Sequence, residues 1–300
     1  NNNNVFILEK KSTNRKIYLK KLPKKIIIGD FRNKKNVERI IKKNKINIIF
    51  HLGAITQVLQ SLKNPIETHE TNIMGTINFL ESIRKINKKI IFIYSSSDKA
   101  YGELNNRYEY KEDDKLDATY PYDVSKSASD IICQSYSKTY SLKVGIIRSG
   151  NIYGPGDLNL KRLIPEVIIS SIENKRFKIR SSGKLLRDYV YVDDVVDAYL
   201  KVLKKLKNSA DLLKVYNVSS NYNYSVINIV KIILRCMNKT NLKPLIMNNS
   251  KQELKFQRLN FLKIKKELKW YPKIDIKRGI NETVDWYIKN YKNLRKKLKK

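Results

Sequence analysis

Hydrophobic residues in the first half of the chain form short β-branched runs that alternate with longer segments of helical period. The runs predict strands at residues 5–8, 25–28, 46–52, 89–95 and 144–148. The segments between them predict helices at residues 36–43, 65–86 and 121–140. Strands that alternate with helices are typical of repeated βα units around a parallel sheet. The pattern therefore predicts an α/β protein with a doubly wound parallel sheet.

Beyond residue 155 the predicted elements become shorter and less regular. Helices are predicted near residues 164–173, 192–206 and 226–237, with a last amphipathic helix from residue 280. Strands are predicted at residues 177–180 and 215–218. We expect residues 1–155 to form the larger domain, residues 156–290 a smaller α/β region, and residues 291–300 a basic tail.

The chain is strongly basic, with 62 Lys and Arg against 28 Asp and Glu and a formal net charge of +34. Because the lysines are scattered through almost every segment, we interpret them mainly as a solvated surface and expect no nucleic-acid partner. The charge would still attract small anionic substrates. No apolar run approaches the ~20 residues that span a bilayer, and no signal segment opens the chain. We therefore expect a cytoplasmic protein without a membrane partner.

Cysteine and histidine are too sparse for a disulfide framework or a zinc site. Cys133 and Cys236 lie far apart inside predicted helices, where small buried side chains are the expected role. His51 and His69 are the only histidines, so no metal cluster can be assembled from them. We expect no bound metal.

The strongest chemical signal is Tyr122 followed by Lys126, at the start of the helix predicted from residue 121. Side chains four residues apart lie on one helix face. An ammonium beside a phenol favours the phenolate, so Lys126 is expected to lower the pKa of Tyr122 from about 10 toward neutrality. Tyr122 would then act as a general acid or base on a hydroxyl group. The preceding strand ends in serines up to Ser97, and one of these could bind the same hydroxyl.

In a chain with 19 tyrosines such a pair also arises by chance, but other runs match one family in the same order. They are residues 51–54 (HLGA), 72–76 (NIMGT), 96–102 (SSDKAYG), 148–156 (RSGNIYGPG), 187–194 (RDYVYVDD) and 268–272 (LKWYP). With them the chain resembles the extended short-chain dehydrogenases, specifically the NAD-dependent nucleotide-sugar epimerase/dehydratase family. The resemblance implies a Rossmann-like fold, a catalytic set of Ser97, Tyr122 and Lys126, and a homodimer. Residues 1–155 would form the dinucleotide-binding domain, and residues 156–290 would mainly bind a nucleotide-diphosphate sugar.

Within that family the two positions after the catalytic serine separate reactions. Simple 4-epimerases usually carry neutral residues there, whereas this chain has Asp98 and Lys99. A 4,6-dehydratase must expel the C6 hydroxyl and remove the C5 proton, so it needs one more acid and one more base. The resemblance, which is nearest to the CDP-glucose 4,6-dehydratases, implies that Asp98 is the acid and Lys99 the base. A solvated ion pair at the strand end is the alternative.

The resemblance also assigns the binding residues. Those expected to contact NAD are Glu9, Asp30, Phe31, Leu52, Gly53, Ala54, Thr56, Asn72, Tyr122 and Lys126. Those expected to hold the sugar nucleotide are Asn151, Arg162 and Arg187, since Arg forks suit a diphosphate. Surface arginines without a ligand are the alternative for the last two. Asp30 could instead cap the following helix.

One part of the family pattern has no counterpart in this sequence. The family places a Gly-rich turn after its first strand, where backbone amides hold the pyrophosphate. Before residue 75 the chain has only Gly29 and Gly53. Residues 5–9 resemble the family's second strand, so we expect its first strand and helix to be absent, with a gap or exposed edge in the sheet and weak cofactor binding. Glu9 at a ribose would favour NAD over NADP, although Lys10, Lys11 and Arg15 leave NADP open.

Three functions are consistent with these residues. The leading one is a nucleotide-sugar 4,6-dehydratase that transiently oxidises C4. The alternative is a nucleotide-sugar 4-epimerase, which needs only the Ser-Tyr-Lys set. The third is an inactive, truncated chain that binds polyanions through its basic surface.

Overall fold

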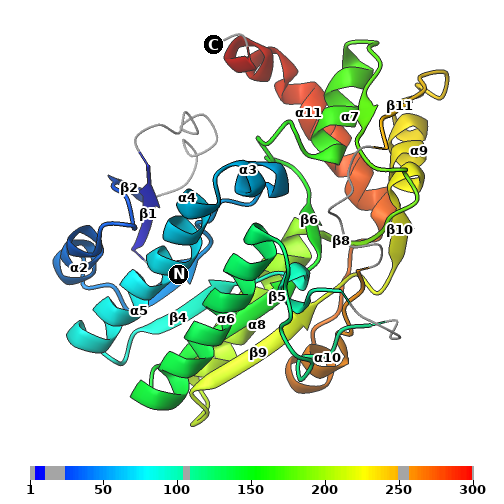
Figure 1. The fold of residues 1–300 in the computed structure, drawn as a ribbon. Helices are drawn as coiled ribbons and strands as arrows, with labels where there is room; N and C mark the ends of the chain where they lie inside the picture. The colour runs from blue at the N-terminus through cyan, green and yellow to red at the C-terminus, as the bar shows by residue number, and fades with distance from the viewer. Residues whose placement is uncertain (1–3, 11–23, 104–108, 249–256, 299–300) are drawn as a thin grey trace.

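The protein is described from a computed structural model, which covers residues 4–10, 24–103, 109–248 and 257–298 (Figure 1). Its main sheet has four parallel strands in the order β3-β4-β5-β9. These are β3 (Ile48–His51), β4 (Ile91–Ser95), β5 (Val144–Ser149) and β9 (Leu213–Val218). The α/β class and the parallel sheet predicted from the sequence are confirmed.

A second parallel sheet consists of β1 (Val5–Glu9) and β2 (Lys24–Ile28). Among the described strands neither of these pairs with β3, so the parallel array is divided between β1 and β3. Beside the division, Phe50 on β3 and the following Leu52 are 39% and 61% exposed. The expected gap in the sheet is therefore confirmed.

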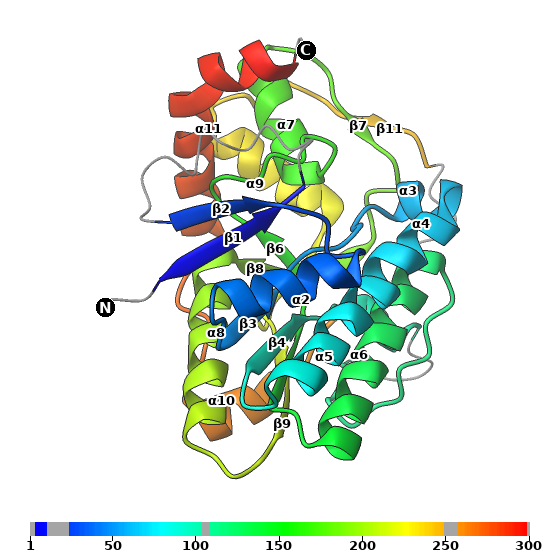
Figure 2. The ribbon, with the colours of Figure 1, turned by 90° about the vertical axis from the view of Figure 1, so that its left-hand side faces the viewer.

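Helices cover both faces of the main sheet (Figure 2). On one face lie α2 (Lys34–Lys43), α5 (Gly75–Ile86) and α6 (Pro121–Tyr140), which share an apolar core with β4 and β5. On the other face lie α8 (Val192–Lys207) and α10 (Leu262–Leu268), whose core includes the fully buried Trp270. Two layers of helices around a sheet match the doubly wound arrangement expected from the sequence.

The helix predicted over residues 65–86 is not continuous. After the short α3 (Val58–Lys63), it consists of α4 (Pro65–His69), a π-helical turn (Glu70–Met74) and α5. The π turn inserts an extra residue into the helical repeat, which hydrophobic periodicity alone does not reveal.

The smaller region is built on two short sheets and three helices. One sheet has the order β10-β8-β6, and the other pairs β7 with β11. The strands are β6 (Asn151–Tyr153), β7 (Lys178–Ile179), β8 (Leu186–Tyr191), β10 (Asn223–Ser225) and β11 (Leu245–Ile246). The helices α7 (Leu163–Ile172), α9 (Val226–Cys236) and α11 (Ile276–Leu298) share one apolar core.

The predicted boundary at residue 155 does not divide the chain into two consecutive units, because α8 and β9 return to the main sheet. Helix α11 continues to Leu298, so most of the predicted basic tail is helical. No helix within the described ranges combines the length and apolar character needed to cross a membrane.

Candidate functional site

The predicted catalytic segment follows the carboxyl end of β4. Ser97 caps the single 3₁₀ turn Asp98–Tyr101, accepting a bond from the Lys99 amide at 3.3 Å. The Ser97 hydroxyl donates to Asp98 Oδ1 at 2.9 Å. Carboxyl ends of parallel strands are where α/β folds bind ligands. The turn therefore lies where the sequence places the chemistry.

Helix α6 brings Tyr122 to the same place. It begins at Pro121, which suits a first helical position, and Tyr122 is only 7% exposed. Burial raises the pKa of Tyr122, and the Asp98 carboxyl raises it further, while a bond with Ser97 acts in the opposite direction. Ser97, Asp98 and Tyr122 are thus close enough to act on one another.

Lys126 does not act on Tyr122 in the way the spacing predicts. Its ammonium donates to the Ser95 carbonyl oxygen at 2.7 Å and lies 5.1 Å from the centroid of the Tyr94 ring. Burial lowers the pKa of Lys126 to about 8. The expectation that Lys126 lowers the pKa of Tyr122 toward neutrality is wrong for this structure, because burial of the phenol outweighs other effects on its pKa.

Asp98 has the environment of a carboxylic acid rather than of a solvated ion. It is 4% exposed, and burial raises its pKa despite the opposing charges of Lys99 and Arg187. Arg187 on β8 is itself only 6% exposed and donates to the Leu186 carbonyl oxygen. The alternatives of a solvated Asp98–Lys99 ion pair and of a surface Arg187 therefore do not describe the structure. Lys99 is half-buried at the next position.

The two other predicted substrate residues lie toward the smaller region. Asn151 is half-buried on β6, paired with Tyr189 of β8. Arg162, just before α7, bonds the Asp157 carboxylate at 3.1 Å and the Thr56 hydroxyl at 3.3 Å. Its side chain is 47% exposed. Arg162 therefore connects the smaller region with the loop after β3.

The predicted adenosine side lies at the ends of β1 and β2. The Gly29 amide donates to the Glu9 carbonyl oxygen at 3.0 Å, which holds the two strand ends together. The Asp30 carboxylate is bound by the Arg32 guanidinium, with an Nη2–Oδ2 distance of 2.6 Å, and this bond lowers its pKa. Asn33, not Asp30, caps α2. The capping alternative for Asp30 is therefore wrong. Lys11 and Arg15 lie outside the described residues.

Phe31 packs against two glycines. A Cβ atom would approach the Phe31 ring to 2.7 Å at Gly53 and to 2.4 Å at Gly75, so both positions need glycine for this packing. The Phe31 ring also meets the His51 ring edge-on at 5.2 Å. His51 is buried, and burial lowers its pKa to about 3, which confirms it as a packed strand residue. Leu52, Gly53 and Ala54 follow β3, with Leu52 largely exposed.

Asn72 is buried in the π turn and holds three segments together. Its amide bonds both backbone groups of Ile55, at 2.8 and 3.0 Å, and donates to the Ser125 hydroxyl at 2.8 Å. The carboxamide thus fixes the loop after β3 against α6. A π turn at such a position is common near functional sites.

These positions fit a dinucleotide at its two ends. Glu9 ends β1, while Asp30, residues 52–54 and Ser97 follow β2, β3 and β4, so they share one edge of the parallel strands. A dinucleotide lies along that edge in doubly wound folds. No Gly-rich turn that could hold the pyrophosphate occurs among the described residues. The chain therefore offers groups for the nicotinamide and adenosine ends.

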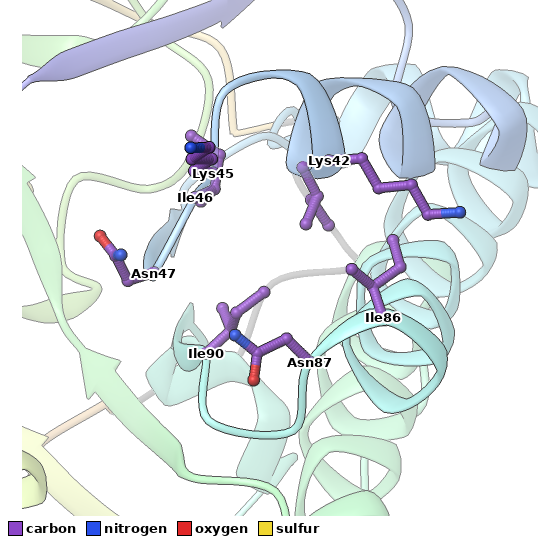
Figure 3. Close-up of a pocket in the computed structure, with 8 residues that line it drawn as sticks. Lys42, Lys45, Ile46, Asn47, Ile86, Asn87 and Ile90 are labelled. Atoms are coloured by element: carbon purple, nitrogen blue, oxygen red, sulfur yellow. The ribbon is translucent and has the colours of Figure 1, made fainter.

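Two surface hollows lie away from these residues. One, of about 450 Å³, is lined by Ile41, Lys42, Ile46, Ile86 and Ile90 and lies at the amino ends of β3 and β4 (Figure 3). It contains none of the predicted site residues, which gather at the opposite ends of these strands.

Sequence reasoning missed a buried network behind the catalytic turn. Arg148 belongs to a matching run and Ser96 to the serine cluster, but neither had a role, and Asp130 was not singled out. The sequence did contain a signal for Asp130, because it follows Tyr122 and Lys126 at the same interval of four residues.

Comparisons with known proteins identify the family of the chain. The family model for GDP-mannose 4,6 dehydratase matches residues 2–283. A human dTDP-D-glucose 4,6-dehydratase is 33% identical over 280 residues, covering 90% of this chain and 76% of its own length. Among solved structures, Thermotoga maritima UDP-glucose 4-epimerase with UDP-glucose has a TM-score of 0.88 and 25% identity, covering 97% of this chain and 92% of its own.

Bacillus anthracis dTDP-glucose 4,6-dehydratase, solved in complex with NAD, has a TM-score of 0.84 and 26% identity. The match covers 97% of this chain and 91% of that one. A family model that spans most of the chain and a relative above 30% identity point to the same group. The chain therefore belongs to the GDP-mannose 4,6 dehydratase family, within the NAD-dependent nucleotide-sugar epimerases and dehydratases of the extended short-chain dehydrogenases.

Proposed function

We propose that this chain is a nucleotide-sugar 4,6-dehydratase that works with NAD. The observation that carries the proposal is the buried Asp98 carboxyl, which is bonded to Ser97 and has a raised pKa. A buried carboxyl with a raised pKa is suited to protonate a leaving hydroxyl, and a 4-epimerase has no such step. The dehydratase relatives support the same reaction class.

The proposed reaction begins with an oxidation and an elimination, and each of these steps uses its own residues. Tyr122 takes the proton of the C4 hydroxyl in its phenolate form as hydride leaves C4, while the Ser97 hydroxyl binds the same oxygen. The positive charge of a bound nicotinamide would favour the phenolate, against the burial that raises the pKa of Tyr122. Lys99 removes the C5 proton, and Asp98 gives its proton to the C6 hydroxyl, which leaves as water. Hydride then returns to C6 and a proton to C5, so the net change is the loss of one water.

When bound, NAD supplies the acceptance and return of that hydride. The groups proposed for it are Glu9 and Asp30 at the adenosine end and Tyr122 and Lys126 at the nicotinamide end. Lys126 faces the Ser95 carbonyl oxygen at the tip of β4, so its ammonium is held at the edge along which the dinucleotide would lie.

Arg162 and Arg187 are proposed to hold the diphosphate, with Asn151 near the sugar. The forked donors of Arg suit two phosphate groups. Arg162 is the more accessible, and a diphosphate would compete with Asp157 for its guanidinium. The strong positive charge of the chain supports the attraction of such an anion.

A product assay tests the proposal. The purified protein is incubated with NAD and, in turn, with dTDP-, UDP- and CDP-glucose and GDP-mannose. A 4,6-dehydratase yields a 4-keto-6-deoxy sugar, which absorbs at alkaline pH, whereas the 4-epimer does not. Conversion to the epimer alone, without loss of water, would overturn the proposal in favour of the alternative that the Thermotoga maritima neighbour represents.

A homodimer is proposed through the outer faces of α4, the π turn and α6. These segments contact one another and carry Ile66, Met74 and Ile131, which are 74%, 50% and 51% exposed. Large apolar side chains left exposed on neighbouring helices are typical of an association surface.

A further inference from the structure

A buried ion pair lies behind the catalytic turn. Arg148 on β5 and Asp130 on α6 have side chains that are 2% and 0% exposed. Arg148 Nε and Nη2 each donate to one Asp130 carboxylate oxygen at 2.9 Å. A two-point bond of this kind fixes the relative orientation of both groups, and removing one partner leaves a costly buried charge.

Asp130 connects this pair to the strand tip that carries the catalytic serine. Tyr122, Lys126 and Asp130 follow one another at intervals of four residues, so they lie along one face of α6. Asp130 Oδ2 also accepts the Ser96 hydroxyl at 2.7 Å. Ser96 immediately precedes Ser97, and its amide donates to the Ile147 carbonyl oxygen at 2.8 Å. Helix α6 is therefore bonded through Asp130 to Ser96, which precedes the capping residue Ser97 of the turn.

Arg148 connects the same pair to the other end of the turn. Its Nη1 donates to the Tyr101 hydroxyl oxygen at 2.9 Å. The Tyr101 hydroxyl in turn donates to Asn217 Oδ1 at 2.7 Å, and its ring stacks on Tyr110 with centroids 4.8 Å apart. Tyr101 is the last residue of the 3₁₀ turn that begins at Asp98. The turn is thus held at both ends by one ion pair.

We propose that Asp130 and Arg148 are positioning residues that, through Ser96 and Tyr101, fix Ser97, Asp98 and Lys99 relative to Tyr122 and Lys126. This inference rests on the proposed function of the turn. Asp130 and Arg148 contact the groups that hold the turn rather than the reacting atoms. A displacement of about 1 Å at a reacting group costs up to about 100-fold in rate, so small errors in the turn are expected to matter.

The test uses two mild substitutions that remove single bonds. Ser96→Ala removes the bond to Asp130, and Tyr101→Phe removes the bonds to Arg148 and Asn217 while keeping the ring. Each is expected to lower kcat about tenfold with KM changed less than about twofold, because neither residue holds the substrate.

Two matched controls separate positioning from general loss of stability. Ser137→Ala removes a buried bond from the same helix, to the Leu142 carbonyl oxygen at 2.8 Å, and Tyr216→Phe removes a bond to Glu267 at 2.6 Å. They are expected to lower Tm as much as the test variants and to leave kcat unchanged. If Ser96→Ala and Tyr101→Phe match their controls in kcat as well as in Tm, the proposal is overturned.

A second measurement does not depend on activity. Crystal structures of wild type and Ser96→Ala are expected to show residues 97–99 displaced and Tyr122 and Lys126 unmoved; a turn that stays in place overturns the proposal. A wild type that converts none of the sugar nucleotides would contradict the proposed function, while this structural comparison would still test the positioning.

Arg148→Lys, which keeps the charge but loses the forked guanidinium, is expected to fold and to have a lower kcat than the surface variant Arg176→Lys.

Discussion

The Ser97 hydroxyl donates to Asp98 Oδ1 at 2.9 Å, while Asp98 Oδ2 is buried and has no hydrogen-bond partner among the described residues. A buried carboxylate oxygen without a partner destabilises the ionised form, which is why burial raises the pKa of this group. The unpaired oxygen is thus suited to carry a proton. Ser97 and Asp98 are neighbours in sequence, yet the proposed mechanism makes one a donor to the sugar oxygen and the other a proton source.

Replacing Asp98 by Asn should stop elimination while sparing oxidation. We expect Asp98→Asn to lower the rate of product formation by about 100-fold or more, since a positioned general acid contributes about that much. Oxidation at C4 should persist, because it needs only Ser97, Tyr122 and Lys126. Single-turnover absorbance of the reduced nicotinamide follows the first step, and alkaline absorbance of the product follows the second.

Asp211→Asn is the control, since the Asp211 side chain is 66% exposed. If Asp98→Asn slows both steps equally, Asp98 acts on the whole site rather than as the acid of elimination.

Lys126→Met should remove activity without removing stability. The pKa of Lys126 falls from 10.5 to about 8 on burial, so between those values the unfolded chain binds more protons than the folded one. The free energy of unfolding of the wild type therefore rises as the pH goes from about 8 to 10.5. Below pH 8 the buried ammonium destabilises the folded chain by up to about 3 kcal/mol.

Urea unfolding of wild type and Lys126→Met from pH 7 to pH 10 measures this difference. The variant is expected to be at least as stable as wild type at pH 7 and to lose that advantage as the pH rises. A variant that is clearly less stable at pH 7 would show that the bond to the Ser95 carbonyl oxygen outweighs the burial of the charge.

Arg162→Gln should weaken binding more than chemistry. The guanidinium is half-exposed and is bound by Asp157 and Thr56, so a diphosphate can reach it. We expect KM for the sugar nucleotide to rise about tenfold and kcat to change little, which is the pattern of lost uniform binding. Arg176→Gln is the control, because it removes the same charge at an exposed site and shows how far KM depends on the overall charge of the protein. A similar rise of KM in both variants would contradict a direct contact.

Charged substitutions on the outer helices should separate the proposed dimer. In Ile66→Lys combined with Ile131→Lys, two exposed apolar side chains become charged, which an apolar interface does not tolerate. Light scattering after gel filtration is expected to show a dimer for wild type and a monomer for the double variant. Leu262→Lys, at an exposed position on α10, should leave the mass unchanged. A monomeric wild type would refute the dimer.

Much of the fold follows from local pattern. The periodicity of residues 121–140 predicts α6 with the bounds that the structure shows, because Pro121 marks its start and no later residue breaks it. The gap beside β3 does not follow from periodicity; it was expected from the resemblance, because residues 5–9 resemble the family's second strand. The π turn at Asn72 is not predictable from local pattern, because its stability comes from bonds to Ile55 and Ser125, which are distant in sequence.

The site was predictable in its members but not in its electrostatics. Motif order brings Ser97, Asp98 and Tyr122 together, whereas the pKa of Tyr122 depends on burial that no spacing reveals. Arg148 shows the same limit, since its run alone does not tell whether the side chain faces a ligand or Asp130. Such contacts are set by tertiary packing of elements that are separated along the chain.

The isolation of β1 and β2 from β3 has a consequence for how the protein opens. None of the β1 and β2 side chains whose burial is described is fully buried, although Leu8 packs against the core of α2 and α5, while β4 and β5 lie inside a continuous ladder. Segments with few buried contacts open at lower free energy than the core. We expect amide hydrogens of β1 and β2 to exchange with deuterium through local openings that leave those of β4 and β5 protected.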